Sequence, residues 1–263
     1  MVGNVPVGGG APCAVQSMLN LPLSEVEENL AQIERVAQAG CDIIRIAIPH
    51  ATDLDYFEQI CTRSVLPVVA DIHFSANLAI EAARRGAAKL RINPGNIGGL
   101  EATIPVLEAA KEAGIPIRIG VNAGSLDKEL YAKYGGPTPE ALVASAMKEA
   151  RMFEDVGFHD FKISVKHHDV VTMVQTYRLL ASKGDWPLHL GVTEAGPTWQ
   201  GTIKSCLAFG ALLAEGIGDT IRVSLTADPV REVVAAKAIL KAAGLRKQGV
   251  NLISCPTCGR TAY

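Results

Sequence analysis

The sequence is poor in aromatic residues, nearly neutral overall, and without a long apolar run. Aromatic residues make up 5% of the chain and the formal net charge is −2. Few aromatics leave little for base stacking, and a near-neutral chain lacks the basic surface that nucleic acids require. No run reaches the roughly 20 apolar residues of a membrane span. We therefore expect neither a nucleic-acid partner nor a membrane segment.

The sequence also lacks a leader and closely spaced cysteines, with one exception. The first residues, MVGNVPVGGGAP, show no basic stretch followed by an apolar run, so they do not resemble a secretory signal. Of the six cysteines, only Cys255 and Cys258 lie close together. Scattered cysteines without export are typical of a reducing compartment rather than a disulfide framework. The sequence predicts a cytoplasmic protein.

What the chain does have is eight alternations of a short apolar segment with a helical segment. The predicted strands are Ala14–Met18, Asp42–Ile48, Pro67–Asp71, Lys89–Asn93, Pro116–Val121, Asp160–Val165, Pro187–Val192 and Thr220–Leu225. They are rich in Ile, Val and Leu, as expected for parallel strands buried on both faces. Eight β-then-α units predict an α/β fold, a (β/α)8 TIM barrel over residues 1–248. A doubly wound open sheet is the alternative, but eight near-equal units favour closure.

Helix boundaries are predicted from capping residues and glycines. Ser24 and Glu27 have the spacing of a capping box for the first helix, and Gly40 supplies a left-handed stop. Thr138-Pro139 and Asp228-Pro229 each place a cap residue before a proline at the first helical position.

Five predicted strands carry a basic residue at or near their C-terminal ends. These residues are Arg45, Arg91, Arg118, Lys166 and Arg222. Burying an unpaired charge costs several kcal/mol. One such residue could pair with a carboxylate such as Asp71, but five in equivalent places predict a ring for a multiply anionic ligand. Lys162 shares a strand face with Lys166 but lies deeper, so Lys166 is the preferred ligand.

Other polar residues gather at the same strand ends, where the active site of a TIM barrel lies. They are Asp71, His73, Asn93, Asn122 and Ser224. Asn and Ser side chains add neutral donors to the charged ones. His73 either binds a phosphate oxygen or is a loop histidine with local partners, and the sequence does not decide between them.

Glu194, in the segment GVTEAG after the seventh strand, is the candidate for proton transfer. A structural role as counter-ion to Lys166 or Arg222 is the alternative.

Cys255-Pro-Thr-Cys258 is a second chemical signal. Its spacing suits a shared metal, an iron–sulfur cluster or a redox disulfide. No further cysteine pair or histidine partner follows, so a closed zinc site cannot be assembled from these residues. Residues 249–254 (GVNLIS) have the pattern of a new strand, and residues 249–263 are therefore predicted to begin a second domain that is incomplete here.

Long stretches of the chain resemble one family, the 4-hydroxy-3-methylbut-2-enyl diphosphate synthases of the methylerythritol phosphate route to isoprenoids. The matching stretches run from Val2 to Arg260 and include VGNVPVGGGAPCAVQSM, VADIHF, LRINPGNIG, IPIRIGVNAGSL, FKISVK, LHLGVTEAG, EGIGDTIRVSL and SCPTCGR. The resemblance implies an oxidoreductase that opens 2-C-methyl-D-erythritol 2,4-cyclodiphosphate with two electrons from flavodoxin or ferredoxin. It implies a homodimer and a small α+β domain that holds a [4Fe–4S] cluster.

The resemblance also assigns roles to residues. The anion-binding positions fall on Arg45, Arg91, Arg118 and Lys166, with Asn122 and Ser224 assisting, and the active-site glutamate falls on Glu194. Cys255 and Cys258 match the first two cluster ligands, and the remaining ligands lie outside this chain.

Two other functions fit the residues alone. One is a non-redox transferase barrel of the dihydropteroate-synthase kind that acts on a diphosphate ester without iron. The other is a non-enzymatic barrel that binds a phosphorylated ligand.

Overall fold

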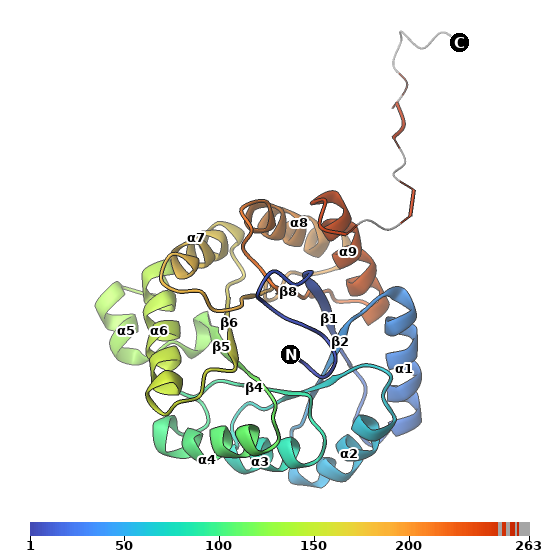
Figure 1. Cartoon of the computed structure of the whole chain (residues 1–263). Helices are drawn as coiled ribbons and strands as arrows, with labels where there is room; N and C mark the ends of the chain where they lie inside the picture. Colours follow the sequence, from blue (N-terminus) through green and yellow to red (C-terminus); the bar gives the residue numbers. More distant parts are fainter. Residues whose placement is uncertain (247–248, 251–252, 256, 258–263) are drawn as a thin grey trace.

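The computed structural model describes residues 1–246, 249–250, 253–255 and 257, and in this part eight parallel strands form a ring inside a ring of helices (Figure 1). The strands are hydrogen-bonded in the order β6-β5-β4-β3-β2-β1-β8-β7. A bridge between Ile163 and Leu188 joins β6 to β7 and closes the ring. The predicted (β/α)8 barrel is confirmed, and the open-sheet alternative is wrong.

The strands are β1 (Ala14–Met18), β2 (Ile43–Ala47), β3 (Val68–Asp71), β4 (Lys89–Ile92), β5 (Ile117–Asn122), β6 (Phe161–Lys166), β7 (His189–Leu190) and β8 (Thr220–Ile221). The α-helices are α1 (Val26–Ala39), α2 (Leu54–Arg63), α3 (Ala76–Arg84), α4 (Gly99–Glu112), α5 (Lys128–Tyr134), α6 (Pro139–Asp155), α7 (Val170–Ala181), α8 (Thr198–Ala214) and α9 (Pro229–Ala242). Two 3-10 turns precede α2 and α5, at Ala51–Asp53 and Ala123–Ser125. None of the helices in the described residues is long and apolar enough to cross a membrane.

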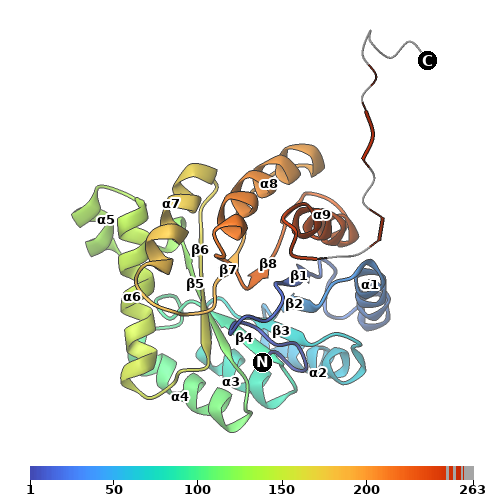
Figure 2. The ribbon, with the colours of Figure 1, turned by 45° about the horizontal axis from the view of Figure 1, so that its top comes forward.

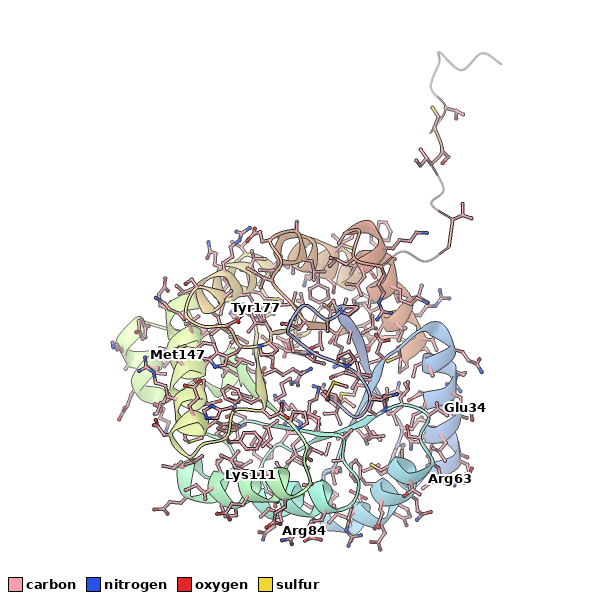
Figure 3. All side chains as sticks on the ribbon, in the orientation of Figure 1. Glu34, Arg63, Arg84, Lys111, Met147 and Tyr177 are labelled. Atoms are coloured by element: carbon pink, nitrogen blue, oxygen red, sulfur yellow. The ribbon has the colours of Figure 1, made fainter. Side chains whose placement is uncertain are left out.

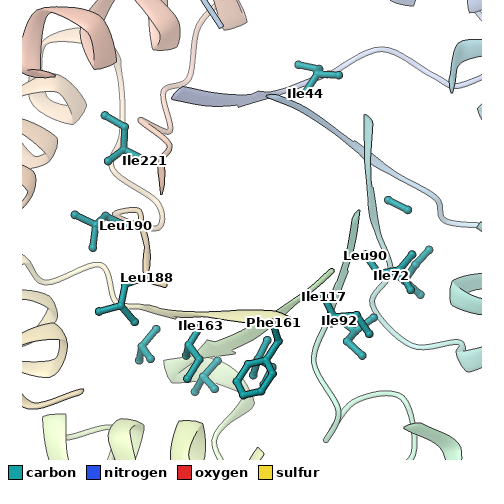
Figure 4. Close-up of a cluster of buried hydrophobic side chains, with 14 of the residues drawn as sticks. Ile44, Ile72, Leu90, Ile92, Ile117, Phe161, Ile163, Leu188, Leu190 and Ile221 are labelled. Carbon is teal, nitrogen blue, oxygen red and sulfur yellow. The ribbon is translucent and has the colours of Figure 1, made fainter. Parts of the chain in front are cut away.

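Alternation along each strand separates an apolar outer layer from a polar interior. Leu90, Ile117 and Ile163 are fully buried and face outward, toward the helices (Figure 4). The residues between them face the barrel axis. Arg91 pairs in register with Asp71 on one side and Arg118 on the other, so the strand-end charges lie at neighbouring levels.

Three of the four predicted helix signals are confirmed. Gly40 ends α1 with a φ of 99°, and the side chains of Thr138 and Asp228 cap α6 and α9. The capping box of Ser24 and Glu27 is wrong. α1 begins at Val26, and its N-cap, Glu25, makes no side-chain cap bond.

Local contacts explain why that capping box does not form. The side chain of Asn29 donates to the carbonyl oxygens of Pro22 and Glu25, at 2.7 and 2.8 Å, and so fixes the first turn. The Glu27 carboxylate accepts two hydrogen bonds from the guanidinium of Arg63, at 2.5 and 2.7 Å. Glu27 therefore links α1 to α2 instead of capping its own helix.

The last two strands are shorter than predicted because side chains take up backbone groups that would extend the ladder. Asp219 accepts the Leu188 N–H at 2.7 Å before β8 begins. Glu232 on α9 accepts the Leu225 N–H at 3.0 Å. Between these contacts the Arg222 N–H still donates to the Leu190 carbonyl oxygen at 3.0 Å, so the chain leaves its neighbour only after Arg222.

The N-terminal residues close one end of the barrel. Val2 and Val5 form an antiparallel bridge. Val2 is buried against Ala14, Ile43 and Val69, which face the barrel axis at the N-terminal ends of their strands. Figures 1 and 2 show this segment crossing the barrel axis. The opposite end, where the strand-end cations lie, is left as the barrel mouth.

The predicted strand at 249–254 is wrong for the residues described. Gly249, Val250, Ile253 and Ser254 lie in no strand, and Val250 and Ile253 are 85% and 88% exposed. No strand of the described part lies beside this segment to pair with it, and a lone strand is unstable in water. The predicted domain boundary at 248/249 stays a prediction.

Candidate anion-binding site

The barrel interior holds more buried cations than buried carboxylates. The buried cationic residues are Arg45, Lys89, Arg91, Arg118, Lys162 and Lys166, and the buried acidic ones are Asp71 and Glu232. Figure 3 shows side chains filling the ring of strands. Because charges buried in protein are normally paired, this surplus of positive charge predicts that the interior receives an anion.

Asp71, at the end of β3, organises one side of the mouth. Its carboxylate lies 3.5 Å from Arg45 Nε, 3.1 Å from Arg91 Nη1 and 3.4 Å from His73 Nε2. Burial by itself would raise the pKa of Asp71, but Arg45, the His73 hydrogen bond and Arg91 hold that pKa well below its usual range. Asp71 is therefore an ionised anchor for two arginines rather than a ligand for an anion.

Arg222, the cation of β8, also has an acidic partner. Its Nη2 and Nε lie 3.2 and 3.4 Å from the Glu232 carboxylate. The Ser17 hydroxyl donates to the same carboxylate at 2.9 Å. The charge of Arg222 is thus offset from α9.

Arg118 and Lys166, on neighbouring strands β5 and β6, have no acidic partner in the described residues. Arg118 is 1% exposed, and its Nε and Nη1 make no hydrogen bond. Lys166 is 8% exposed and forms neither a hydrogen bond nor an ion pair with a described residue. Burial lowers the pKa of both side chains well below the usual values, and neighbouring arginines lower them further. These two residues are the strongest anion-seeking groups of the mouth.

Two strand glycines make room for the cations. A Cβ on Gly120 of β5 would lie 2.7 Å from Arg91 Nε, and a Cβ on Gly191 would lie 2.8 Å from Lys166 Nζ. Any larger residue would push these side chains out of place. Glycine inside a strand is a signal of such a close approach, and it could have marked both positions in the sequence, although the strand pattern alone did not single them out.

The neutral donors of the prediction follow or end the strands β4, β5 and β8. Asn93 is buried directly after β4, and its carbonyl oxygen accepts the N–H groups of Asn96 and Ile97 at 3.0 and 3.2 Å. The Asn122 amide, oriented by its hydrogen bonds, accepts from Arg91 Nη2 at 3.3 Å. Ser224 is half-buried beyond β8.

Glu194 lies exposed on the loop after β7, with a φ of 52°. A positive φ in a non-glycine residue is strained and is found at functional sites. The Glu194 carboxylate forms no ion pair with a described residue, and Arg222 is held by Glu232 instead. The counter-ion alternative for Glu194 is therefore wrong, while its proton-transfer role stays a prediction.

His73 follows β3 and has local partners. Besides its contact with Asp71, its Nδ1 lies 3.3 Å from Arg91 Nη1. About half of its side chain is exposed. The histidine thus sits at the rim, within reach of both Asp71 and the solvent.

Two acidic residues near the site were not predicted from the sequence. Glu232 lies on a helix, where its side chain gave no reason to expect an inward contact. Glu149 on α6 has a carboxylate oxygen that is buried without a hydrogen-bond partner, beside the Gly95 loop. Burial raises the pKa of Glu149 to about 8, against the lowering effect of Arg91 and Lys148.

The predicted metal ligands lie near the C-terminal end of the chain, where the structure describes only one of the two. Cys255 is an exposed free thiol, and Cys258 lies outside the described residues. Within the residues that are described, no three His, Cys, Asp or Glu side chains are placed so that they could hold a metal ion.

Comparison with known proteins shows the family of the chain. Residues 1–237 match a family model described as "GcpE TIM-barrel domain". The chain is 66% identical over 261 residues to 4-hydroxy-3-methylbut-2-en-1-yl diphosphate synthase (flavodoxin) of Bifidobacterium longum, covering 99% of this chain and 65% of that protein. It is 57% identical over 260 residues to the protein of the same name from Frankia alni, covering 98% and 68%. The chain thus spans about two thirds of the length of these relatives.

Solved structures with similar folds are distant in sequence. Dihydropteroate synthase of Yersinia pestis superposes with a TM-score of 0.61 at 17% identity, covering 89% of this chain and 93% of the other. The spore coat polysaccharide biosynthesis protein spsE of Bacillus subtilis gives a TM-score of 0.63 at 14% identity, covering 94% and 74%. At these identities the likeness shows the barrel fold alone.

Proposed function

The chain belongs to the GcpE TIM-barrel family, and we propose that it is the substrate-binding barrel of a 4-hydroxy-3-methylbut-2-en-1-yl diphosphate synthase. The proposed substrate is 2-C-methyl-D-erythritol 2,4-cyclodiphosphate, whose ring is opened and dehydroxylated reductively on the way to isoprenoids. The supporting relatives carry this enzyme's name. The transferase and the non-enzymatic alternatives have only the fold in their favour.

One observation carries the proposal: the pair of buried cations without acidic partners among the described residues, Arg118 and Lys166. A cyclic diphosphate carries two phosphoryl groups, which offer negative charge and several acceptor oxygens. Guanidinium and ammonium groups bind such oxygens through charge-assisted hydrogen bonds. The ligand would supply the negative charge that the protein does not provide. Arg118 and Lys166 would then be buried as paired rather than unpaired charges, which lowers the free-energy cost of burying them.

The remaining residues are proposed to hold the diphosphate in register. Arg45 and Arg91 are fixed by Asp71, so they present their remaining N–H groups in set directions. Asn93, Asn122 and Ser224 would add neutral donors, and His73 would contact the ligand from the rim. Preorganised donors cost no reorganisation when negative charge develops, which is the usual source of electrostatic catalysis.

Glu194 is proposed to act in proton transfer. Loss of a hydroxyl as water requires a proton at the departing oxygen, and a carboxyl group is a suitable general acid. Glu194 sits on the mouth loop with an exposed side chain that no described residue pairs with. Its positive φ marks a strained backbone, which is common at functional sites.

A [4Fe–4S] cluster would supply the two electrons in such an enzyme, but the described residues do not provide a site for it. Cys255 is one exposed thiol, and two cysteines cannot hold four irons by themselves. We therefore propose Cys255 and Cys258 only as a partial ligand set, completed by residues outside this chain. The barrel's own contribution is binding, orientation and proton transfer.

We also propose an electron donor and an oligomeric state. The names of the relatives point to flavodoxin as the electron donor, and ferredoxin remains the alternative. The family resemblance also implies a homodimer.

Calorimetric titration of the cyclodiphosphate into the purified chain tests the binding half of the proposal. We expect saturable binding that inorganic diphosphate competes away, and none with the phosphate-free 2-C-methyl-D-erythritol. Turnover should appear only when the cluster-bearing part of the protein and a reductant are supplied. Turnover of a diphosphate ester by the chain alone, without iron or reductant, would instead support the transferase barrel.

A further inference from the structure

A second polar layer lies in the barrel below the mouth, and the proposed function makes no use of it. It consists of five inward-facing residues from β1, β4, β6, β7 and β8: Gln16, Lys89, Lys162, His189 and Thr220, which are named here the floor layer. Lys162 precedes Lys166 by four residues on β6, which corresponds to roughly 13 Å of strand. The floor layer therefore lies deeper in the barrel than Lys166, and Lys162 is in register with Arg118 of β5.

The two lysines of the floor layer are buried, and both line one small cavity. Lys89 is 0% exposed and Lys162 is 3% exposed, and burial lowers the pKa of both amines, that of Lys162 to about 7. Their hydrogen-bond partners are neutral: Lys89 donates to Gln16 Oε1 at 3.2 Å, and Lys162 donates to Thr220 Oγ1 at 3.0 Å. Neither lysine forms an ion pair with a described residue.

Further donors in this layer are also unsatisfied. Gln16 Nε2 and His189 Nε2 are buried without a hydrogen-bond partner, and His189 Nδ1 is already occupied by Thr220 at 2.8 Å. Orphaned buried polar groups of this kind cost about 1–3 kcal/mol each. The layer thus has more hydrogen-bond donors than acceptors, and it includes the side chains of Lys89 and Lys162. None of its five residues is a carboxylate.

A small cavity borders the two lysines. It has a volume of about 30 Å³ and is lined by Lys89 and Lys162 together with Val2 and Val7 of the N-terminal segment. A cavity needs roughly 10–15 Å³ on this measure to hold one water-sized species. Its acidic lining residue, Asp160, is exposed to solvent. The space accommodates a monatomic ion and is too small for a phosphate ester.

We propose that this cavity is a binding site for a small monovalent inorganic anion such as chloride, held between Lys89 and Lys162 and covered by the N-terminal segment. A water molecule there would accept hydrogen bonds but would bring no negative charge to two lysines that form no ion pair with a described residue. An anion offsets both charges at once. It thereby favours the protonated form of both lysines, against the effect of burial, which lowers their pKa values.

Bromide, which replaces chloride and scatters anomalously, locates the site. Crystals of the chain grown or soaked in bromide should show an anomalous peak in contact with Lys89 and Lys162. Peaks confined to the mouth or to the outer surface would overturn the proposal.

Thermal unfolding measures the same site in solution. At equal ionic strength, chloride should raise Tm saturably over potassium gluconate, whose anion is too large for the cavity. Lys162→Met keeps the volume of the side chain and removes its charge, so it should lose part of the chloride effect. Lys111→Met is the matched control, because Lys111 lies on the outer ring of helices (Figure 3). The mouth cations themselves are unchanged in both variants, and the position of the bromide peak shows which of the two sites holds the anion.

Equal chloride responses in wild type, Lys162→Met and Lys111→Met would also overturn the proposal. Lys89→Met provides a second variant if Lys162→Met does not fold. This test is independent of the proposed enzymatic function, because it uses neither the cyclodiphosphate nor an electron donor.

Discussion

The two sides of the barrel mouth differ in whether their buried cations have an acidic partner. On the side formed by β2, β3 and β4, Arg45 and Arg91 share the carboxylate of Asp71. On the side formed by β5 and β6, Arg118 and Lys166 have no acidic partner among the described residues. Both sides are equally enclosed, so the difference lies in pairing and not in burial.

The paired cations therefore orient a ligand, whereas the unpaired cations attract it. A paired arginine is held in one orientation and contributes a set direction for its free N–H groups, at little cost to stability. An unpaired buried cation costs stability and gains when an anion arrives. We therefore expect the paired side to respond to substitutions mainly in stability, and the unpaired side mainly in ligand affinity.

Asp71→Asn should give the largest effect, and it should be an effect on stability. The change removes the carboxylate and leaves Arg45 and Arg91 buried without a counter-charge, which costs about 3–5 kcal/mol for a broken buried pair. Urea unfolding monitored by circular dichroism measures it. The control is Asp55→Asn, which breaks an exposed ion pair with Arg85 and should change stability little. Similar stabilities for the two variants would contradict the assignment of Asp71 as the anchor.

The pH dependence sharpens this prediction. The pKa of Asp71 is lower in the folded chain than in the unfolded chain, so its contribution is complete above about pH 4. That contribution is lost as the pH falls through the folded-state pKa. Asp71→Asn should therefore show a shallower loss of stability in acid than wild type does.

Arg118→Ala should mainly affect affinity. Removing one partner of a charge-assisted contact with the cyclodiphosphate should weaken binding by about 2–4 kcal/mol. The free protein should not lose comparable stability, because no described acidic residue would lose its partner. Calorimetry measures the dissociation constant, and Arg84→Ala, at the outer edge of α3 (Figure 3), is the control. An unchanged dissociation constant would remove Arg118 from the site.

Lys166 should make binding consume protons. Burial and then Arg118 lower the pKa of Lys166 well below its usual value, and a bound anion raises it again. The chain should take up as much as about one proton per ligand, so affinity should weaken as the pH rises, by at most roughly 1.4 kcal/mol per pH unit. Calorimetry in buffers with different ionisation enthalpies measures the uptake. It should shrink in Lys166→Met and persist in Lys111→Met.

The sequence predicted the frame of the mouth because strand ends follow from local patterns. Apolar runs gave the eight strands, and the closed barrel then put Arg45, Arg91, Arg118 and Lys166 at one end of it. Even the deeper position of Lys162 followed from strand alternation. These inferences need only the two-residue period of a strand and the direction of parallel strands.

The pairing of those cations could not be predicted, because it depends on contacts between distant segments. Glu232 reaches Arg222 and Ser17 from α9, and neither contact follows from a local pattern. The capping box of Ser24 and Glu27 failed for the same reason, since Arg63 on the next helix attracts Glu27. The proposed role of Glu194 remains untested by geometry, although its strained backbone is a new mark of the site.

Gly191→Ala should give the smallest effect of the substitutions considered. It should lower ligand affinity while leaving stability nearly unchanged, as expected for the unpaired side. The added methyl group would lie 2.8 Å from the Cε and Nζ atoms of Lys166. Because these atoms are the far end of a flexible side chain, the lysine can move aside at little cost to stability. Affinity for the cyclodiphosphate should fall by about 1 kcal/mol as Lys166 leaves its position, the lower end of the cost of overpacking.

Gly120→Ala, on β5, applies the same change against a cation of the paired side, Arg91 of β4. There the methyl group would meet Arg91 Nε at 2.7 Å, and Arg91 is held by Asp71 and cannot yield without losing that contact. We expect Gly120→Ala to lower the urea midpoint more than Gly191→Ala does. Gly210→Ala on α8, where a Cβ meets nothing within 4 Å, serves as the control. If both mouth variants lost stability equally, the contrast between a fixed side and a yielding side would be wrong.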